Sequence, residues 1–155
     1  MNSERDRVVV GVDGSVGSQV ALRWALDEAH RRHADLEIVT CWHPPDVAGA
    51  SEYAEANLSC DDLTADTRSE LDRVLHAVND DINALIAHGS DVTSRLLEGP
   101  PGPRLVTESK GAAMLVVGRR GHGALVRLIL GSVSSHVSDY ATCPVVVVPD
   151  DLGWP

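Results

Sequence analysis

The sequence contains no phenylalanine, three tryptophans and two tyrosines, so aromatic residues make up only 3% of its 155 residues. A chain of this length can form one domain with a buried core. Without aromatic side chains, that core must be built from valine, leucine, isoleucine and alanine. No internal repeat or linker divides the sequence, and we predict a single domain over residues 1–155.

Long hydrophobic runs are also missing. No apolar run approaches the roughly 20 residues of a membrane-spanning helix, and the first seven residues, MNSERDR, lack the apolar core of a secretory signal. The three cysteines, Cys41, Cys60 and Cys143, are odd in number and lack the spacing of metal ligands. We therefore expect reduced thiols in a cytoplasmic protein that does not bind membranes.

Basic residues are scarce, and Lys110 is the only lysine. The formal net charge of −10 disfavours nucleic acid as a partner, because phosphate backbones require a basic face. Acidic residues are in turn absent between Glu108 and Asp139, where Lys110, Arg119, Arg120 and Arg127 lie. A basic window in an acidic protein suits a small anionic ligand. The alternative is a chance gap, since buried strands exclude charge.

Apolar runs rich in β-branched residues predict five strands, most of them buried on both faces. They are expected at Val8–Val12, Leu36–Trp42, Asp91–Gly99, Ala112–Gly118 and Pro144–Val148, with the third at a sheet edge. Helical spacing of apolar residues predicts helices between these strands. They are expected at Val16–His33, from about Leu71 to near Gly89, from Pro100 to Ser109, and from Gly131 or Ser132 onward.

Alternating strands and helices predict an α/β fold, with an open, mostly parallel sheet and helices on both faces. The stretch from His43 to Asp62 has no clear periodicity. We interpret it as a lid, a binding loop or a disordered segment.

Four glycines lie in the stretch VVGRRGHGALVRLILGSVSSHV, from Val116 to Val137. Gly118, at the exit of a predicted strand, would allow close approach of backbone and ligand, and Gly121 and Gly123 could adopt positive φ angles. Gly131 precedes a predicted helix, so the amides and hydroxyls that follow it would face an anion. Ordinary turns and caps use the same residues, but their combination favours a phosphate site.

Two common phosphate motifs are excluded. A Walker A loop needs Gly-Lys-Ser/Thr, and a dinucleotide fingerprint needs G-x-G-x-x-G after the first strand, where this chain has Val-Asp-Gly-Ser. The seven histidines give no zinc pattern, and no catalytic residues can be read from the spacing.

The spacing Gly118-x2-Gly121-x9-Gly131-Ser132 resembles the nucleotide-binding signature of the universal stress protein family. The resemblance extends to the opening VVVGVDGS, to CPVVVVP near the end and to the order of elements. It implies a five-stranded parallel sheet in the order 3-2-1-4-5 that binds ATP, with Mg²⁺ neutralising the phosphates. Its last strand, Val145–Val148, would pair with a second copy in a homodimer.

The resemblance also implies roles for individual residues. Val12 and Asp13 would meet adenosine, the Cys41 backbone would meet adenine, and Val117 and Gly118 would line the ribose. The phosphates would be held by Gly121, Gly131, Ser132, Val133 and Ser134. Gly123, Arg119 and Arg120 complete the predicted site, although Asp13 could be only a turn residue and the arginines only solvated.

The function expected from this resemblance is that of a regulatory, stress-response protein whose ATP occupancy modulates its interactions with a protein partner. Three alternatives remain open: a slow ATPase, a cyclic-nucleotide binder and a dimeric scaffold that binds no nucleotide. The sequence provides no clear general base, so any ATP hydrolysis should be slow.

Overall fold

The computed structural model describes residues 5–43, 59–122 and 130–152. Five parallel strands form one sheet in the order β3-β2-β1-β4-β5, as the family resemblance implied. The strands are β1 Arg7–Gly11, β2 Asp35–Trp42, β3 Val92–Glu98, β4 Met114–Gly118 and β5 Val145–Val148. The helices are α1 Val16–Arg32, α3 Cys60–Ala77, α4 Asn79–Ala87, α5 Pro101–Glu108 and α6 Ser132–Tyr140. The predicted fold class is therefore confirmed.

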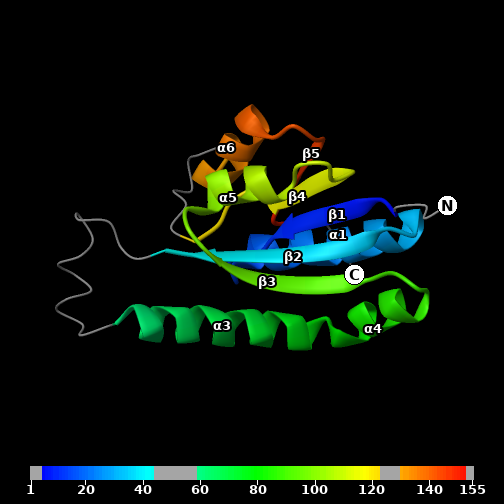
Figure 1. Cartoon of the computed structure of the whole chain (residues 1–155), viewed down its shortest axis with the longest axis horizontal. Coiled ribbons are helices and arrows are strands. Elements are labelled where there is room, and N and C mark those ends of the chain that lie inside the picture. The colour runs from blue at the N-terminus through cyan, green and yellow to red at the C-terminus, as the bar shows by residue number, and fades with distance from the viewer. Residues whose placement is uncertain (1–4, 44–58, 123–129, 153–155) are drawn as a thin grey trace.

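Helices cover both faces of the sheet (Figure 1), as expected for parallel strands joined by helical crossovers. Side chains alternate along β1, so Val8 and Val10 face one core while Val9 faces the other. The first core contains residues of α1, α3 and α4, and the second contains residues of α5 and α6. Apart from Met114, the buried residues of both cores are valine, leucine, isoleucine and alanine, in agreement with the absence of phenylalanine.

The helix predicted from about Leu71 to near Gly89 is wrong as a continuous element. The chain leaves helical geometry at Val78, where φ is −118° and ψ is 17°, and α3 and α4 lie on either side of this break. Val78 is itself buried, so the apolar periodicity continues through the break and conceals it. A capping box between Ser59 and Asp62 starts α3 at Cys60, within the predicted loop. Residues 44–58 of that loop lie outside the described residues.

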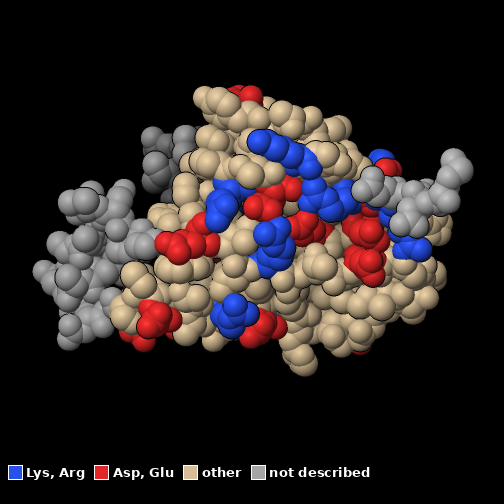
Figure 2. All heavy atoms as spheres, viewed as in Figure 1, with Lys and Arg blue, Asp and Glu red and all other residues tan. Residues whose placement is uncertain are grey.

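A network of charged side chains fixes α5 to the sheet at the end opposite the β1–α1 turn. Glu37 on β2 is 8% exposed and accepts from both Arg7 and Arg95. Arg95 also pairs with Glu108 at a distance of 2.6 Å. The Arg7 guanidinium donates to the carbonyls of Glu108 and Lys110, so a cation caps the C-terminus of α5. Figure 2 shows basic and acidic side chains lying close together near the middle of the face that it draws. The position of α5 matters because its other end reaches the site described next.

Candidate functional site

A cavity of about 430 Å³ opens at the carboxyl ends of the central strands, beside α5 and α6. Strand order reverses between β1 and β4, and open parallel sheets bind ligands at such a switch point. Most of the residues predicted for the site line this cavity: Val12, Asp13, Cys41, Val117, Gly118, Gly121, Gly131, Ser132, Val133 and Ser134. The fold thus brings together the turn after β1 and the glycine stretch, which lie about 100 residues apart in the sequence.

Three predicted residues are not placed there. Arg119 and Arg120 do not line the cavity, and Gly123 lies outside the described residues. The guanidinium of Arg120 instead pairs with Asp150, with its Nη2 atom 2.6 Å from Oδ2. Six further residues line the cavity that sequence reasoning missed: Gly11, Ser18, Val39, Pro101, Leu105 and His122.

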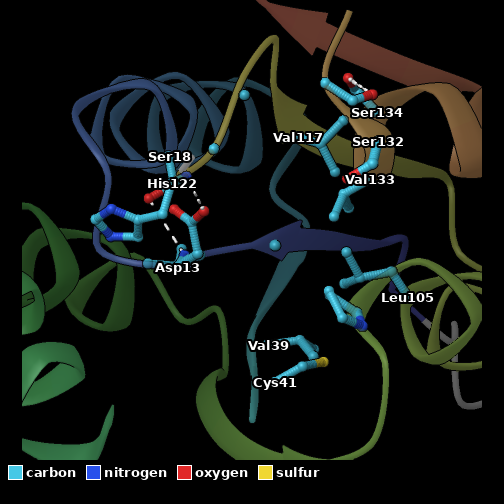
Figure 3. A pocket seen from close by; sticks show the side chains of 16 residues that line it. Asp13, Ser18, Val39, Cys41, Leu105, Val117, His122, Ser132, Val133 and Ser134 are labelled. Carbon is cyan, nitrogen blue, oxygen red and sulfur yellow. Dashed lines mark hydrogen bonds between the residues drawn. The ribbon is translucent and has the colours of Figure 1, made fainter. Parts of the chain in front are cut away.

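The turn after β1 presents Asp13 to the cavity. Gly14 adopts a φ of +85°, which reverses the chain, and Ser15 then caps α1 by accepting from the Ser18 amide. One carboxylate oxygen of Asp13 accepts from the amide and the hydroxyl of Ser15, and the other accepts from the His122 amide at 3.1 Å. Figure 3 shows the Asp13 side chain directed toward His122. Asp13 therefore joins the first turn of the chain to the glycine stretch.

These contacts determine the pKa of the Asp13 carboxyl. Partial burial by itself would raise the pKa, but the hydrogen bonds from Ser15, His122 and Ser18 favour the charged form and outweigh it. The pKa accordingly lies below its ordinary value of 3.8, and Asp13 is a carboxylate at neutral pH.

An Asp13→Asn variant is expected to be less stable than the wild type at neutral pH, with the difference shrinking in acid. A carboxyl whose pKa is lowered by folding stabilises the native state above its unfolded pKa, and this contribution disappears as the pH falls through its folded pKa. Urea unfolding of both proteins at pH 7 and at about pH 3 would measure the effect. A stability difference that grows in acid would contradict the assignment.

Hydrogen bonds made by the backbone of Arg119 hold the loop after β4 in place. The Arg119 amide donates to the Val148 carbonyl on β5, and the Arg119 carbonyl accepts from the Gly131 amide and the Ser134 hydroxyl, each at 2.9 Å. Gly118 packs on the start of α1, because an added Cβ would lie 2.8 Å from the carbonyl carbon of Gly17. Both ends of the glycine stretch are therefore fixed to the sheet and to each other.

Two expectations for this stretch need correction. Gly121 does not have a positive φ; instead, an added Cβ would collide with the Asp13 carboxylate, so a larger residue here would displace that side chain. The Ser134 hydroxyl does not face a ligand freely, because it contacts the carbonyls of Arg119 and Gly131.

The start of α6 is suited to an anion. Gly131 is the N-cap residue and has no side chain to bond the first amides, which by position lack partners within the helix. Ser132 is exposed, and both Ser132 and Val133 line the cavity. The positive end of the helix dipole adds to the attraction for negative charge.

The opposite wall is apolar. Val39 and Cys41 on β2 face Leu105 on α5 across the cavity (Figure 3), and Pro101 is a further apolar lining residue. Burial raises the pKa of the Cys41 thiol to about 11, so the side chain is neutral and behaves as a small apolar group. The cavity can therefore hold a flat apolar ring at one end and an anionic group at the other.

Comparison with known proteins identifies the family of this chain. The sequence model of the universal stress protein family matches residues 4–149. The chain belongs to the universal stress protein family. A universal stress protein of Mycolicibacterium smegmatis is 36% identical over 145 residues, which cover 93% of this chain and 48% of that protein. The chain spans about half the length of the curated relatives it matches.

Solved structures of the family share the fold. A universal stress protein in complex with cAMP is 28% identical, with a TM-score of 0.65 over 94% of this chain and 98% of its own. A universal stress protein of Archaeoglobus fulgidus in complex with dAMP is 21% identical, with a TM-score of 0.61 over 94% of this chain and 98% of its own.

Two further observations concern the described part of the chain. No three histidine, cysteine, aspartate or glutamate side chains in it are grouped so that they could hold a metal ion. None of its helices combines the length and the apolar character needed to cross a bilayer.

Proposed function

We propose that this chain binds an adenine nucleotide in the cavity at the switch point, and that occupancy regulates its interactions with a protein partner. The observation that carries the proposal is the uncapped start of α6 facing an apolar wall across one cavity. The adenine would lie against Val39, Cys41 and Leu105. The phosphates would accept from the amides of Ser132, Val133 and Ser134, in the part of the cavity that Gly121 and Gly131 also line. Val12 and Asp13 would contact the adenosine, and Val117 and Gly118 the ribose.

ATP with Mg²⁺ is the ligand we propose first. Magnesium keeps several waters and binds through phosphates and one or two carboxylates, so a dedicated protein cluster is not required. Asp13 is the carboxylate among the described lining residues. The bound cation would neutralise the phosphates that the α6 amides hold.

Cyclic AMP is the second candidate, favoured by the family structure solved with that ligand at 28% identity. Calorimetric titration of nucleotide-stripped protein with ATP–Mg²⁺, AMP and cyclic AMP would separate the candidates. We expect micromolar binding of ATP, with competition between ATP and cyclic AMP if they share the cavity. If none of the three nucleotides binds to folded protein, the proposal is wrong and a scaffold role gains support.

Sustained ATP hydrolysis that an Asp13→Ala variant loses would favour a slow ATPase.

We further propose that residues 1–155 form one nucleotide-binding domain that pairs with a second copy through β5. The four valines of β5 form an edge strand whose side chains Val145, Val146 and Val147 are only partly buried, and such an edge favours pairing. Sedimentation should show a homodimer at micromolar concentration, and a stable monomer would contradict this.

The cytoplasm is the compartment we propose, since Cys41, Cys60 and Cys143 are all free thiols, as in proteins of reducing compartments. We propose no role in binding nucleic acids or membranes.

A further inference from the structure

The glycine stretch is tied to the end of β5 by an ion pair. The Nε and Nη2 atoms of Arg120 lie 3.0 Å and 2.6 Å from the same oxygen of Asp150. The two side chains are only 28% and 31% exposed, so water screens this pair less than an ordinary surface pair. One residue earlier, the Arg119 amide donates to the Val148 carbonyl. Two consecutive residues of the stretch are thus fixed to the same strand end.

The second carboxylate oxygen of Asp150 lies at the start of α1. An added Cβ at Gly17 would lie 2.7 Å from this oxygen, so glycine leaves the space that the carboxylate needs. The oxygen is buried and accepts no hydrogen bond from the described residues. The first turn of α1 contains no acidic residue of its own, and Asp150 places a negative charge near the positive end of that helix. The Asp150 side chain is therefore held between Arg120 and α1.

The two neighbours of Arg120 contact residues of both polar walls of the cavity. On one side, the Arg119 carbonyl accepts from the Gly131 amide and so fixes the start of α6. On the other side, Gly121 packs against Asp13, and the His122 amide donates to the Asp13 carboxylate. A displacement of Arg120 would move the α6 amides and the Asp13 carboxylate relative to each other.

We infer that Asp150 and Arg120 are positioning residues that hold the two polar walls of the cavity at the separation the ligand requires. The inference rests on the proposed nucleotide binding, and it gives Arg120 a role different from direct phosphate contact. If the pair is broken, the arrangement that can bind becomes less populated, and the apparent affinity falls by the same factor.

The test compares Arg120→Gln, Asp150→Asn and the double variant by calorimetric titration with ATP–Mg²⁺. Each single variant is expected to bind about tenfold more weakly, as for a binding-competent arrangement populated about one-tenth of the time. The affinity of the double variant should be no lower than that of the single variant with the lower affinity, because both changes break the same Arg120–Asp150 pair. Asp139→Asn, an equal change in charge at an exposed position of α6, should bind like the wild type.

The direction in which Asp150→Asn changes the affinity for ATP distinguishes a positioning role of Arg120 from direct contact with phosphate. If Arg120 contacts phosphate directly, removal of its competing carboxylate should strengthen binding while Arg120→Gln weakens it, and that result would overturn the inference. Unchanged affinity in both single variants would also overturn it.

Hydrogen exchange of the nucleotide-free proteins tests the inference without a ligand. Amides of residues 119–122 and 131–135 should exchange faster in both single variants, whereas those of β1 and β2 should not. Unchanged exchange in these segments would overturn the inference. If the wild type binds no nucleotide but these amides exchange faster in the variants, the proposed function is contradicted and the positioning role is left intact.

Discussion

A Gly131→Val variant is expected to fold and to bind nucleotide at least about 100-fold more weakly than the wild type, a loss of roughly 2.7 kcal/mol in binding free energy. A Cβ at this position would lie 3.3 Å from the Arg120 Cα and 3.4 Å from the Arg119 carbonyl oxygen. Both are backbone atoms of the glycine stretch, so the branched side chain must push that stretch away from the start of α6. The amides that would hold phosphate are then displaced from the opposite wall.

Calorimetric titration would measure this loss, with thermal unfolding as a check on folding. Gly131→Ala should show a smaller loss, since its Cβ needs only a shift of a few tenths of an ångström. Thr142→Val places a valine at an exposed position just after α6 by replacing a hydroxyl with a methyl group, and this variant should bind normally. Wild-type affinity in a folded Gly131→Val protein would remove the phosphate assignment.

A Gly118→Val variant is expected to lose about 3 kcal/mol of unfolding free energy, in the range of severe overpacking. An added Cβ would lie 2.8 Å from both the carbonyl carbon and the oxygen of Gly17, and 3.1 Å from the Ser18 nitrogen. These are backbone atoms of α1, so no side-chain rotation relieves the collision. Helix α1 must move away from β4, against which it packs.

Urea unfolding would measure the change, and Gly111→Ala provides the matched control. Gly111 has a φ of +73° and no atom within 4 Å of an added Cβ, so alanine there suffers backbone strain without a collision. We expect a loss of about 1 kcal/mol from that strain alone. If Gly118→Val proves as stable as Gly111→Ala, the close contact between β4 and α1 is not as described.

The strands were predicted within one or two residues because β1, β2 and β4 are buried on both faces and rich in apolar residues, although Glu37 and Thr40 interrupt the apolar run of β2. The break at Val78 could not be predicted in this way. Neither glycine nor proline lies at the break, and the apolar residues before and after Val78 recur at the spacing of one continuous helix. The start of α3 had a signal that was overlooked, since Ser59 and Asp62 have the spacing of a capping box.

For the candidate site, glycine spacing and the family resemblance identified residues on the turn after β1 and around α6. Val39 could have been added, because it lies two residues before Cys41 on one strand face. Pro101 and Leu105 could not, since their place beside the cavity depends on how α5 crosses the sheet. The pairing of Arg120 with Asp150 also depends on the strand order that brings β5 beside β4.

The strand order has a consequence during synthesis on the ribosome. Strands β1, β2 and β3 are neighbours in both sequence and sheet, so they can pair once the chain has emerged as far as Glu98. The other edge of β1, with its three valines, must then wait for Met114–Gly118. A nascent chain paused in that interval exposes an apolar strand edge that favours aggregation. Because Gly131–Ser134 emerge later still, a ligand in the cavity can protect only a nascent chain that has emerged at least as far as Ser134.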